Sequence, residues 1–247
     1  MNWNKLKTFL IVLFSALNII LIITMLTKDY KEAVIPQQTI QDTVDVLKKR
    51  GITIDKAIIP ERSKNMEGFA MQTLKLDSPE AKVTYPGGEL FEITVSQKIS
   101  SLKELTSLLE RLGIQYTEFV SDIKNLKQLK AVETIDDFRI FGNFLDVSVT
   151  ADKVNIKGKW LVPSGVEGED EDKAEPCQVT SILIEFISNP DRPQGKIKIK
   201  NMEFGYFAPG YTLAEKVQSF IVVPCWEISL DTGEKFYYDA RNGEYLR

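Results

Sequence analysis

The sequence predicts an α+β protein in which a single N-terminal transmembrane helix precedes an extracellular region of curved antiparallel sheets with helices packed on one face. Three observations lead to this fold class. Residues 9–26 are uncharged and mostly apolar. Two later segments show helical spacing followed at once by a strand pattern, and most of the remaining chain alternates apolar and polar residues between turns.

The apolar run at residues 9–26 reads FLIVLFSALNIILIITML. A helix of that length rises roughly 27 Å, close to the thickness of the hydrocarbon core of a bilayer. The C-terminal end of the run has no small residues of the kind that precede a signal-peptidase site. Lys5 and Lys7 stand on the short N-terminal side, so we expect an uncleaved anchor with a cytoplasmic N-terminus.

This interpretation divides the chain into four parts: a cytoplasmic N-terminus (1–8), a transmembrane anchor (9–27), a juxtamembrane connector (28–37) and an extracellular α+β regulatory region (38–247). The number of subdomains in the last part is left open. Leu47–Ile54 and Leu109–Tyr116 both read as a helix end, a glycine and a strand. If this is an internal repeat, the subdomains are about 38–98 and 99–247; the acidic loop at 163–176 is a rival boundary.

The periodicity of apolar residues predicts helices at residues 39–49, 102–112, 122–132 and 213–219. Ser100 or Ser101 begins the second helix, and Glu104 is placed for a capping box. Short alternating or apolar runs predict strands at residues 52–54, 69–76, 90–95, 114–120, 144–150, 153–162, 179–187, 195–207, 221–230 and 234–238.

Charge and composition exclude several classes of function. The chain has 31 Lys and Arg against 35 Asp and Glu, a formal net charge of −4, which does not favour nucleic acid as a partner. It has no histidine, which removes His-based catalytic triads and His metal ligands. The acidic run at 169–172 lacks the spacing of an EF-hand. We expect no cofactor, no metal site and no enzymatic activity.

Two cysteines, Cys177 and Cys225, each follow a proline. In an oxidising compartment an even pair is compatible with a disulfide. The alternative is two small buried apolar residues, because free cysteine often takes that role. Sequence alone does not decide between them, and without histidine they make a poor zinc site.

The C-terminal segment has a recognisable order of residues: Pro224-x-Trp226, a turn at Gly233, then Tyr237-Tyr-Asp-Ala240-x-x-Gly243. It resembles the strand–turn–strand end of PepSY-type domains, which are α+β modules that often restrain a partner protein. The resemblance implies that Trp226 anchors a small core and that Gly243 accepts a positive φ.

Further motifs lie at the two ends of the chain: Met1-Asn2-Trp3 and Lys7-Thr8 ahead of the apolar run, then Phe204-Gly-Tyr-Phe207, Pro224-Cys-Trp226 and Asp239-Ala-Arg-Asn-Gly-Glu244. With them the chain resembles the YycI family of membrane-anchored regulators of the YycG/WalK sensor histidine kinase in Gram-positive bacteria. The resemblance implies a YycH/YycI-like α+β domain without catalytic residues. Its implied partners are a sister YycH-type protein and the kinase, in two-component control of cell-wall homeostasis.

The residues predicted to contact a partner lie on one face of the predicted anchor: Thr8, Ser15, Asn18 and Ile22. An amide near the middle of a membrane is costly unless it finds a partner, so Asn18 is expected to bond across to another helix. The alternative is that Asn18 bonds the backbone of its own helix.

Two other functions stay open as alternatives. A ligand- or peptide-binding sensor would use an aromatic groove formed by Tyr206, Phe207, Tyr211 and Trp226. An anchored hydrolase without histidine would need a pair of carboxylates or a Ser-Lys pair in a cleft, and the candidate carboxylates are Glu67, Asp136 and Asp137.

Overall fold

The computed structural model describes residues 7, 13–18, 34–62, 68–76, 78–79, 81–87, 90–115, 117–120, 126–135, 137–164, 176–208 and 220–247. The chain divides into two compact units, Met1–Val34 and Ile35–Arg247. In the first unit, residues 13–18 are helical. All the elements named below belong to the second unit.

The described part of the chain contains no helix that combines the length and the apolar character needed to cross a bilayer. This corrects the predicted transmembrane helix and the single-pass membrane localisation that depended on it. The prediction took residues 9–27 as one helix, and most of that segment lies outside the described residues.

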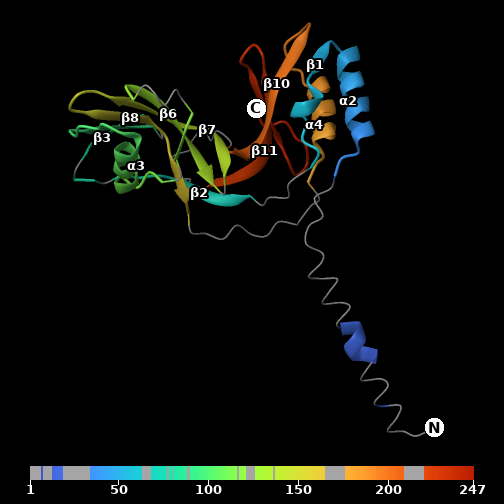
Figure 1. The fold of residues 1–247 in the computed structure, drawn as a ribbon, viewed down its shortest axis with the longest axis horizontal. Helices are drawn as coiled ribbons and strands as arrows, with labels where there is room; N and C mark the ends of the chain where they lie inside the picture. Colours follow the sequence, from blue (N-terminus) through green and yellow to red (C-terminus); the bar gives the residue numbers. More distant parts are fainter. Residues whose placement is uncertain are drawn as a thin grey trace. The chain divides into compact units, whose positions relative to one another are not determined.

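The strands of the described residues join into one twelve-stranded sheet. Its main path runs through β3 (Lys82–Gly87), β4 (Leu90–Val95), β8 (Val154–Gly158), β7 (Phe138–Val149), β10 (Ile197–Phe207), β11 (Phe220–Leu230), β2 (Phe69–Thr73) and β9 (Leu161–Pro163). Off this path lie β1 (Ile52–Ile54) beside β10, β12 (Lys235–Asp239) beside β11, β6 (Gln128–Ile135) beside β7, and β5 (Thr117–Phe119) beside β6. Figure 1 shows the sheet curling from β3 to β11.

The predicted fold class of antiparallel sheets with helices on one face is wrong, because the sheet is mixed and curled and carries few helices. Strand β10 runs parallel to β1 at one end and parallel to β7 at the other. Parallel partners need long connections. The segments of β1 and β10 were correctly expected to be extended, whereas residues 138–143 of β7, which include the partners of β10, were not predicted as strand. A local pattern contains no information about a partner more than fifty residues away.

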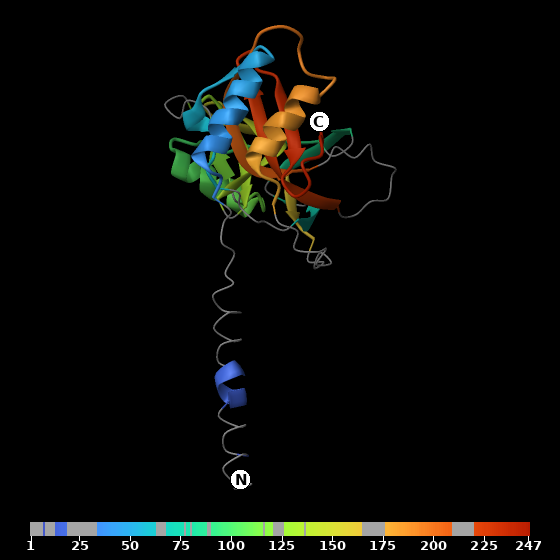
Figure 2. The ribbon, with the colours of Figure 1, turned by 90° about the vertical axis from the view of Figure 1, so that its right-hand side faces the viewer.

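Helices α2 (Gln37–Lys49) and α4 (Val179–Ser188) lie side by side against one face of β1, β10, β11 and β12 (Figures 1 and 2). A short 3₁₀ helix, η1 (Lys56–Ile58), follows β1. The apolar stripe of α2 buries Ile40 and Leu47. These helices and strands share one cluster, whose largest buried members include Ile40, Leu47, Ile52, Phe186, Trp226 and Tyr238.

The segment of α4 was predicted to be a strand at 179–187, and this prediction is wrong. Residues 179–188 read VTSILIEFIS, with six apolar residues of which three are Ile, and so short a run fits a buried strand or a buried helix equally well. Tertiary packing decides for the helix: Val179, Ile182 and Phe186 are buried against the sheet, and the Phe186 ring meets Phe236 edge-on at 5.3 Å.

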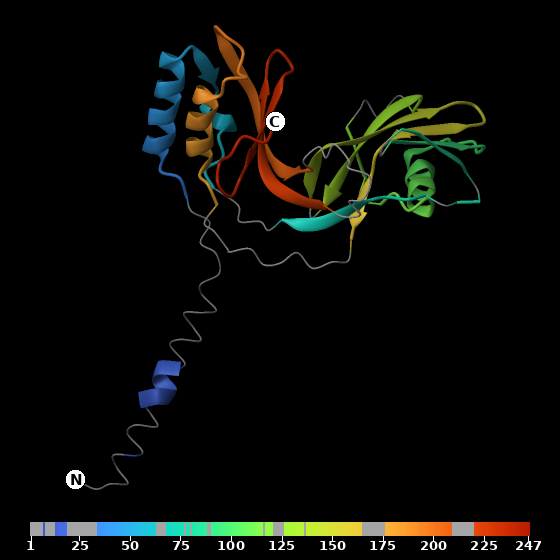
Figure 3. The ribbon, with the colours of Figure 1, turned by 180° about the vertical axis from the view of Figure 1, so that it is seen from behind.

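Helix α3 (Leu102–Arg111) packs on a different part of the sheet, formed by β4, β8, β7 and β6 (Figure 3). The predicted cap is present, because Ser101 Oγ accepts from Glu104 N at 3.3 Å. The Glu104 carboxylate in turn accepts from Ser100 N at 2.8 Å. The cluster under α3 is formed by Leu76, Phe91, Ile93, Val95, Ile99, Leu105, Leu108, Leu109, Leu112, Ile114, Leu129, Ala131, Leu145, Val147, Val149, Val154, Ile156 and Trp160.

The predicted helix at 122–132 is wrong over its described part, where residues 128–132 belong to β6. Leu129, Ala131 and Glu133 are buried in alternation along the strand. The proposed subdomain boundary near residue 98 stays a prediction, although Val95 and Ile99 share the cluster of Leu105.

The two parts of the sheet meet where β7 lies against β10, and Gly205 makes this close approach possible. A Cβ atom at Gly205 would lie 2.5 Å from the carbonyl oxygen of Arg139 and 2.9 Å from the ring of Phe141. No side chain fits there, because a carbonyl of the neighbouring strand cannot move aside as a flexible side chain can.

We therefore expect Gly205→Ala to lower the free energy of unfolding by about 1–3 kcal/mol, because the added methyl overpacks the junction. Urea unfolding measures this change. Phe141→Leu should not rescue the variant, since the clash with the Arg139 carbonyl persists. A wild-type stability for Gly205→Ala would contradict this account of the junction.

Candidate functional site

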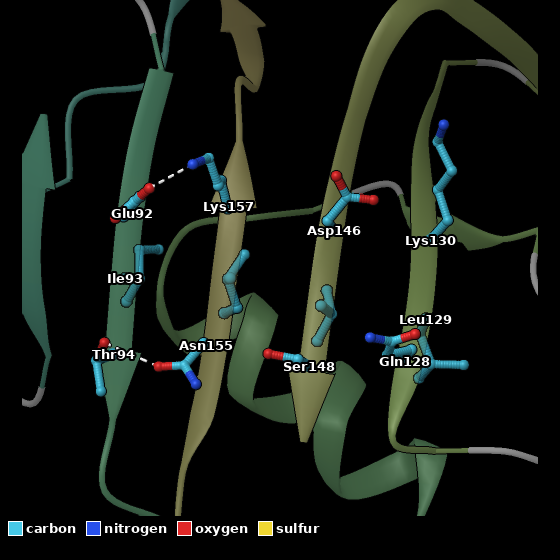
Figure 4. A pocket seen from close by; sticks show the side chains of 12 residues that line it. Glu92, Ile93, Thr94, Gln128, Leu129, Lys130, Asp146, Ser148, Asn155 and Lys157 are labelled. Carbon is cyan, nitrogen blue, oxygen red and sulfur yellow. Dashed lines mark hydrogen bonds and ion pairs between the residues drawn. The ribbon is translucent and has the colours of Figure 1, made fainter. Parts of the chain in front are cut away.

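One face of β4, β8, β7 and β6 is covered by α3, and the other face carries polar side chains in two rows across the strands (Figure 4). The first row is charged and contains Glu92, Lys157, Asp146 and Lys130 in strand order. The second row is neutral and contains Thr94, Asn155, Ser148 and Gln128. We call this surface the two-row face. Its backbone and side chains line a hollow of about 650 Å³.

Members of each row sit directly opposite one another in the strand register. Lys157 Nζ lies 2.6 Å from Glu92 Oε1, and this contact raises the pKa of Lys157. In the neutral row, Thr94 Oγ1 donates to Asn155 Oδ1 at 3.0 Å. Opposite charges on facing positions of neighbouring strands stabilise a sheet, whereas like charges destabilise it. The alternation of sign along the charged row therefore stabilises the sheet within one chain.

A second group of charged residues lies near the contact of β7 with β10, on strands β5, β7, β10, β11 and β12. Arg139 holds Glu118 with two nitrogens, at 2.6 and 2.8 Å, and reaches Glu203 with a third at 3.0 Å. Lys235 Nζ lies 2.8 and 2.9 Å from the two carboxylate oxygens of Glu227. We call these five residues the junction cluster. The hollow beside it measures about 390 Å³ and includes Tyr237, Phe144 and Lys130 in its lining.

Glu203 and Glu227 face each other across β10 and β11. Glu227 is only 3% exposed, and its carboxylate also accepts from Ser229 Oγ at 2.7 Å. Burial raises the pKa of Glu203, with Arg139 opposing the shift and Glu227 adding to it. Two carboxylates at facing positions repel, so Arg139 and Lys235 are the residues that make this arrangement stable.

Glu133 on β6 has a buried carboxyl group, and the residue is only 1% exposed. Its Oε2 accepts from Asn143 Nδ2 at 3.1 Å and from Leu161 N at 3.2 Å. Desolvation nonetheless raises its pKa to about 8, so the group is mostly neutral at pH 7. Asn143 Oδ1 is buried beside it and has no hydrogen-bond partner among the described residues.

The residues predicted for the transmembrane face are only partly described. Thr8 and Ile22 lie outside the described residues. Ser15 and Asn18 are exposed in the helical stretch 13–18, and Asn18 Nδ2 donates to the carbonyl of Phe14 at 2.8 Å. The Asn18 amide therefore has a partner within its own helix.

The predicted aromatic groove is not an open surface at its described positions. Tyr206, Phe207 and Trp226 are each at most 5% exposed, and Tyr211 lies outside the described residues. The Phe207 ring stacks on Tyr237 at 4.7 Å, and the Trp226 ring packs on Phe204 at 4.9 Å. These aromatic side chains hold the strands together. Of the hydrolase candidates, only Asp137 is described, and it is exposed at a turn with φ 67°.

Cys177 and Cys225 are both free thiols. Cys225 packs with Phe207 of β10 and Tyr237 of β12 on one face of the sheet, whereas Cys177 packs with the cluster under α2 and α4 on the other. The sheet thus separates the two sulfur atoms. Burial raises the pKa of both thiols, most strongly at Cys225. In the described part of the chain no three Cys, Asp or Glu side chains gather in a way that could hold a metal ion.

The motifs that carry the family resemblance come together on three adjacent strands. Phe204 in β10 faces Trp226 in β11, and Tyr206 faces Pro224. Cys225 in turn faces Asp239 in β12. Asp239 accepts from the Arg241 guanidinium at 2.7 Å, and Gly243 has φ 79°, as expected for the turn after the last strand.

No protein-family description and no curated protein matches this chain. Among solved structures, an uncharacterized protein from Eubacterium rectale ATCC 33656 is similar, with 11% sequence identity and a TM-score of 0.40. The match covers 87% of this chain and 99% of that one. A likeness of this size supports no conclusion about fold or function, so the resemblance to the YycI family stays a prediction.

The raised pKa of Glu133 predicts a pH dependence of stability. The folded protein keeps the Glu133 proton up to about pH 8, whereas the unfolded chain releases it near its ordinary value of 4.5. Between these values the folded state binds more protons, so Glu133 makes stability fall as pH rises, by up to about 1.4 kcal/mol per pH unit.

Glu133→Gln removes this titration and keeps an acceptor oxygen. We expect urea unfolding between pH 5 and 8.5 to show a shallower loss of stability for Glu133→Gln than for the wild type. The free energy of unfolding of Glu133→Gln, relative to that of the wild type, should therefore increase steadily toward high pH. Two stability curves with the same slope would contradict the assignment.

Proposed function

We propose that this chain is a non-enzymatic regulatory protein of the YycI kind, which binds a sister YycH-type protein and the YycG/WalK sensor histidine kinase. In this function it modulates two-component signalling in cell-wall homeostasis through protein contacts. The proposal keeps the partners implied by the sequence and does not depend on a membrane anchor.

The observation that supports it most is the convergence of the resembling motifs. Phe204–Phe207, Pro224–Trp226 and Asp239–Glu244 are spread over about forty residues of sequence, yet the first two face each other on β10 and β11, and Asp239 at the end of β12 faces Cys225. Residues that together build one structural unit are constrained together. A shared pattern at these positions is therefore more informative than three short motifs counted separately.

The junction cluster gives this unit a surface suited to a charged partner. It lies on the face of β10–β12 that α2 and α4 leave open, since Trp226 and Phe236 face the helices while Glu227 and Lys235 alternate with them. The side chains of Arg139, Glu118 and Glu203 are 34%, 45% and 28% exposed. Partly exposed charges steer association and select partners more than they add affinity.

We expect Glu203→Gln to weaken binding to the YycH-type protein or to the kinase about threefold to tenfold at low salt, because it removes one charge from the junction cluster. Biolayer interferometry with each purified partner measures the effect. The control is Glu185→Gln on α4, the same change on the opposite face, which should bind like the wild type.

The binding measurements test the partners and the binding surface separately. A wild-type chain that binds neither partner would overturn the proposed function. Binding by the wild type that neither substitution changes would leave the partners but remove the junction cluster as their surface.

A second candidate function is a sensor of small ligands, favoured by the hollow beside the junction cluster. At about 390 Å³ it is within the range of small-molecule sites. Its lining includes the two facing carboxylates, Glu203 and Glu227. A cationic ligand that donates hydrogen bonds, such as a small amine, suits a hollow with carboxylates in its lining.

For this second candidate we expect one or more of a panel of small amines and amino acids to raise the thermal midpoint in a concentration-dependent way. Glu203→Gln should reduce the shift. A panel of amines that leaves the midpoint unchanged at millimolar concentration would exclude this candidate.

A further inference from the structure

We infer that the two-row face is the interface of a two-fold symmetric dimer of this chain. The inference concerns a different surface from the junction cluster and does not depend on the proposed function. It rests on the order of charges across four strands and on the geometry of a twisted sheet.

The charged row reads acidic, basic, acidic, basic in the order β4, β8, β7, β6, through Glu92, Lys157, Asp146 and Lys130. Read in the opposite direction, from β6 to β4, the same row is basic, acidic, basic, acidic, so each sign is the opposite of the one at the same place in the forward order. A second copy that meets the row in the reverse order therefore places an opposite charge against every member.

A two-fold axis parallel to the strands, between β8 and β7, produces this reversal. It sets Glu92 against Lys130 of the second copy and Lys157 against Asp146 of the second copy, each contact occurring twice. The same operation sets Thr94 against Gln128 and Asn155 against Ser148. Hydroxyl and amide groups both donate and accept, so the neutral row is self-complementary as well.

The orientation is specified by the charges. An axis along the row would set each residue against itself, Glu92 on Glu92 and Lys157 on Lys157, which is repulsive at every charged position. An axis across the strands and midway between the two rows would set each charge against a neutral group, so only the axis along the strands pairs opposite charges. Isologous contacts of this kind are the commonest way in which identical chains associate.

The twist of the sheet makes the faces compatible in shape. A twisted sheet is a saddle, hollow along one diagonal and raised along the other. A half-turn about a line parallel to the central strands maps a saddle onto itself, so the hollow of one copy receives the raised part of the other. Face-packed sheets align their strands within about 30° for the same reason.

The face is also open in the monomer. Helix α3 covers the opposite side of these strands, and Gln128, Lys130, Asp146, Asn155 and Lys157 are exposed. Because the contacts are polar, the dimer is expected to weaken with salt, as screening shortens the range of the charge pairs.

Sedimentation equilibrium of the full chain tests the inference. We expect a dimer at low ionic strength that dissociates at about 1 M salt, where the Debye length is about 3 Å. Lys157→Glu should weaken dimerisation about tenfold, because it turns two symmetric attractions into repulsions. Lys103→Glu on α3, with the same change in charge off the face, should have no effect.

The decisive variant is the swap of Asp146→Lys with Lys157→Glu. It keeps the net charge and restores opposite charges between the copies, although it places like charges side by side within each copy. We expect it to dimerise more tightly than Lys157→Glu alone. An effect confined to the monomer predicts no gain, since the swap and Lys157→Glu alone each leave two repulsive pairs and one attractive pair between neighbours in the row.

A second swap, Glu92→Lys with Lys130→Glu, should also keep the dimer and serves if Lys157→Glu fails to fold, which circular dichroism reports. A wild-type chain that stays monomeric at low salt would overturn the inference. So would a dimer that Lys157→Glu does not weaken, or one that neither swap sustains.

Discussion

Strand β10 is the element on which the rest of the fold depends. One of its edges pairs with β11, and the other is shared by β1 at one end and β7 at the other. Its side chains enter several hydrophobic clusters, with Ile197 and Ile199 under the α2–α4 pair and Tyr206 and Phe207 beyond it. The absence of a side chain at Gly205 lets β7 approach, so one glycine joins the two parts of the sheet.

The helices determine which faces of this sheet remain available for function. Helices α2 and α4 cover one part and α3 covers another, and each removes an apolar face from water. What remains is polar: the two-row face opposite α3 and the junction cluster opposite α2 and α4. On both surfaces each charged side chain lies beside one of opposite sign, and the junction cluster has three acidic and two basic residues.

The secondary structure was predictable where the pattern of apolar residues was compatible with only a helix or only a strand. The helices at α2 and α3 have clear apolar stripes and end before Gly51 and Gly113, both with φ near 80°. The hairpin between β11 and β12 was evident from its turn glycine. The errors at α4 and β6 arose where a short apolar or mixed run was compatible with either state, and burial against the sheet made the choice.

The candidate surfaces were harder to predict than the elements. The alternation of residues 144–150 and 153–162 already indicated that Asp146, Ser148, Asn155 and Lys157 share one side of their strands. It did not indicate that β4 and β6 flank them, which is what turns separate charges into a row. Glu203, Glu227 and Arg139 were not singled out at all, because no spacing in the sequence connects three different strands.

The sequence alone thus determined composition, charge, the absence of histidine, most strand and helix positions and the motifs at the chain ends. Those properties depend on residues within one or two turns of each other. Only the tertiary structure decided the parallel pairing at β10, the helical state of α4, the burial of Tyr206 and Trp226 and the assembly of both polar surfaces. Each of these depends on contacts between distant segments, whose free energy exists only once the chain has brought them together.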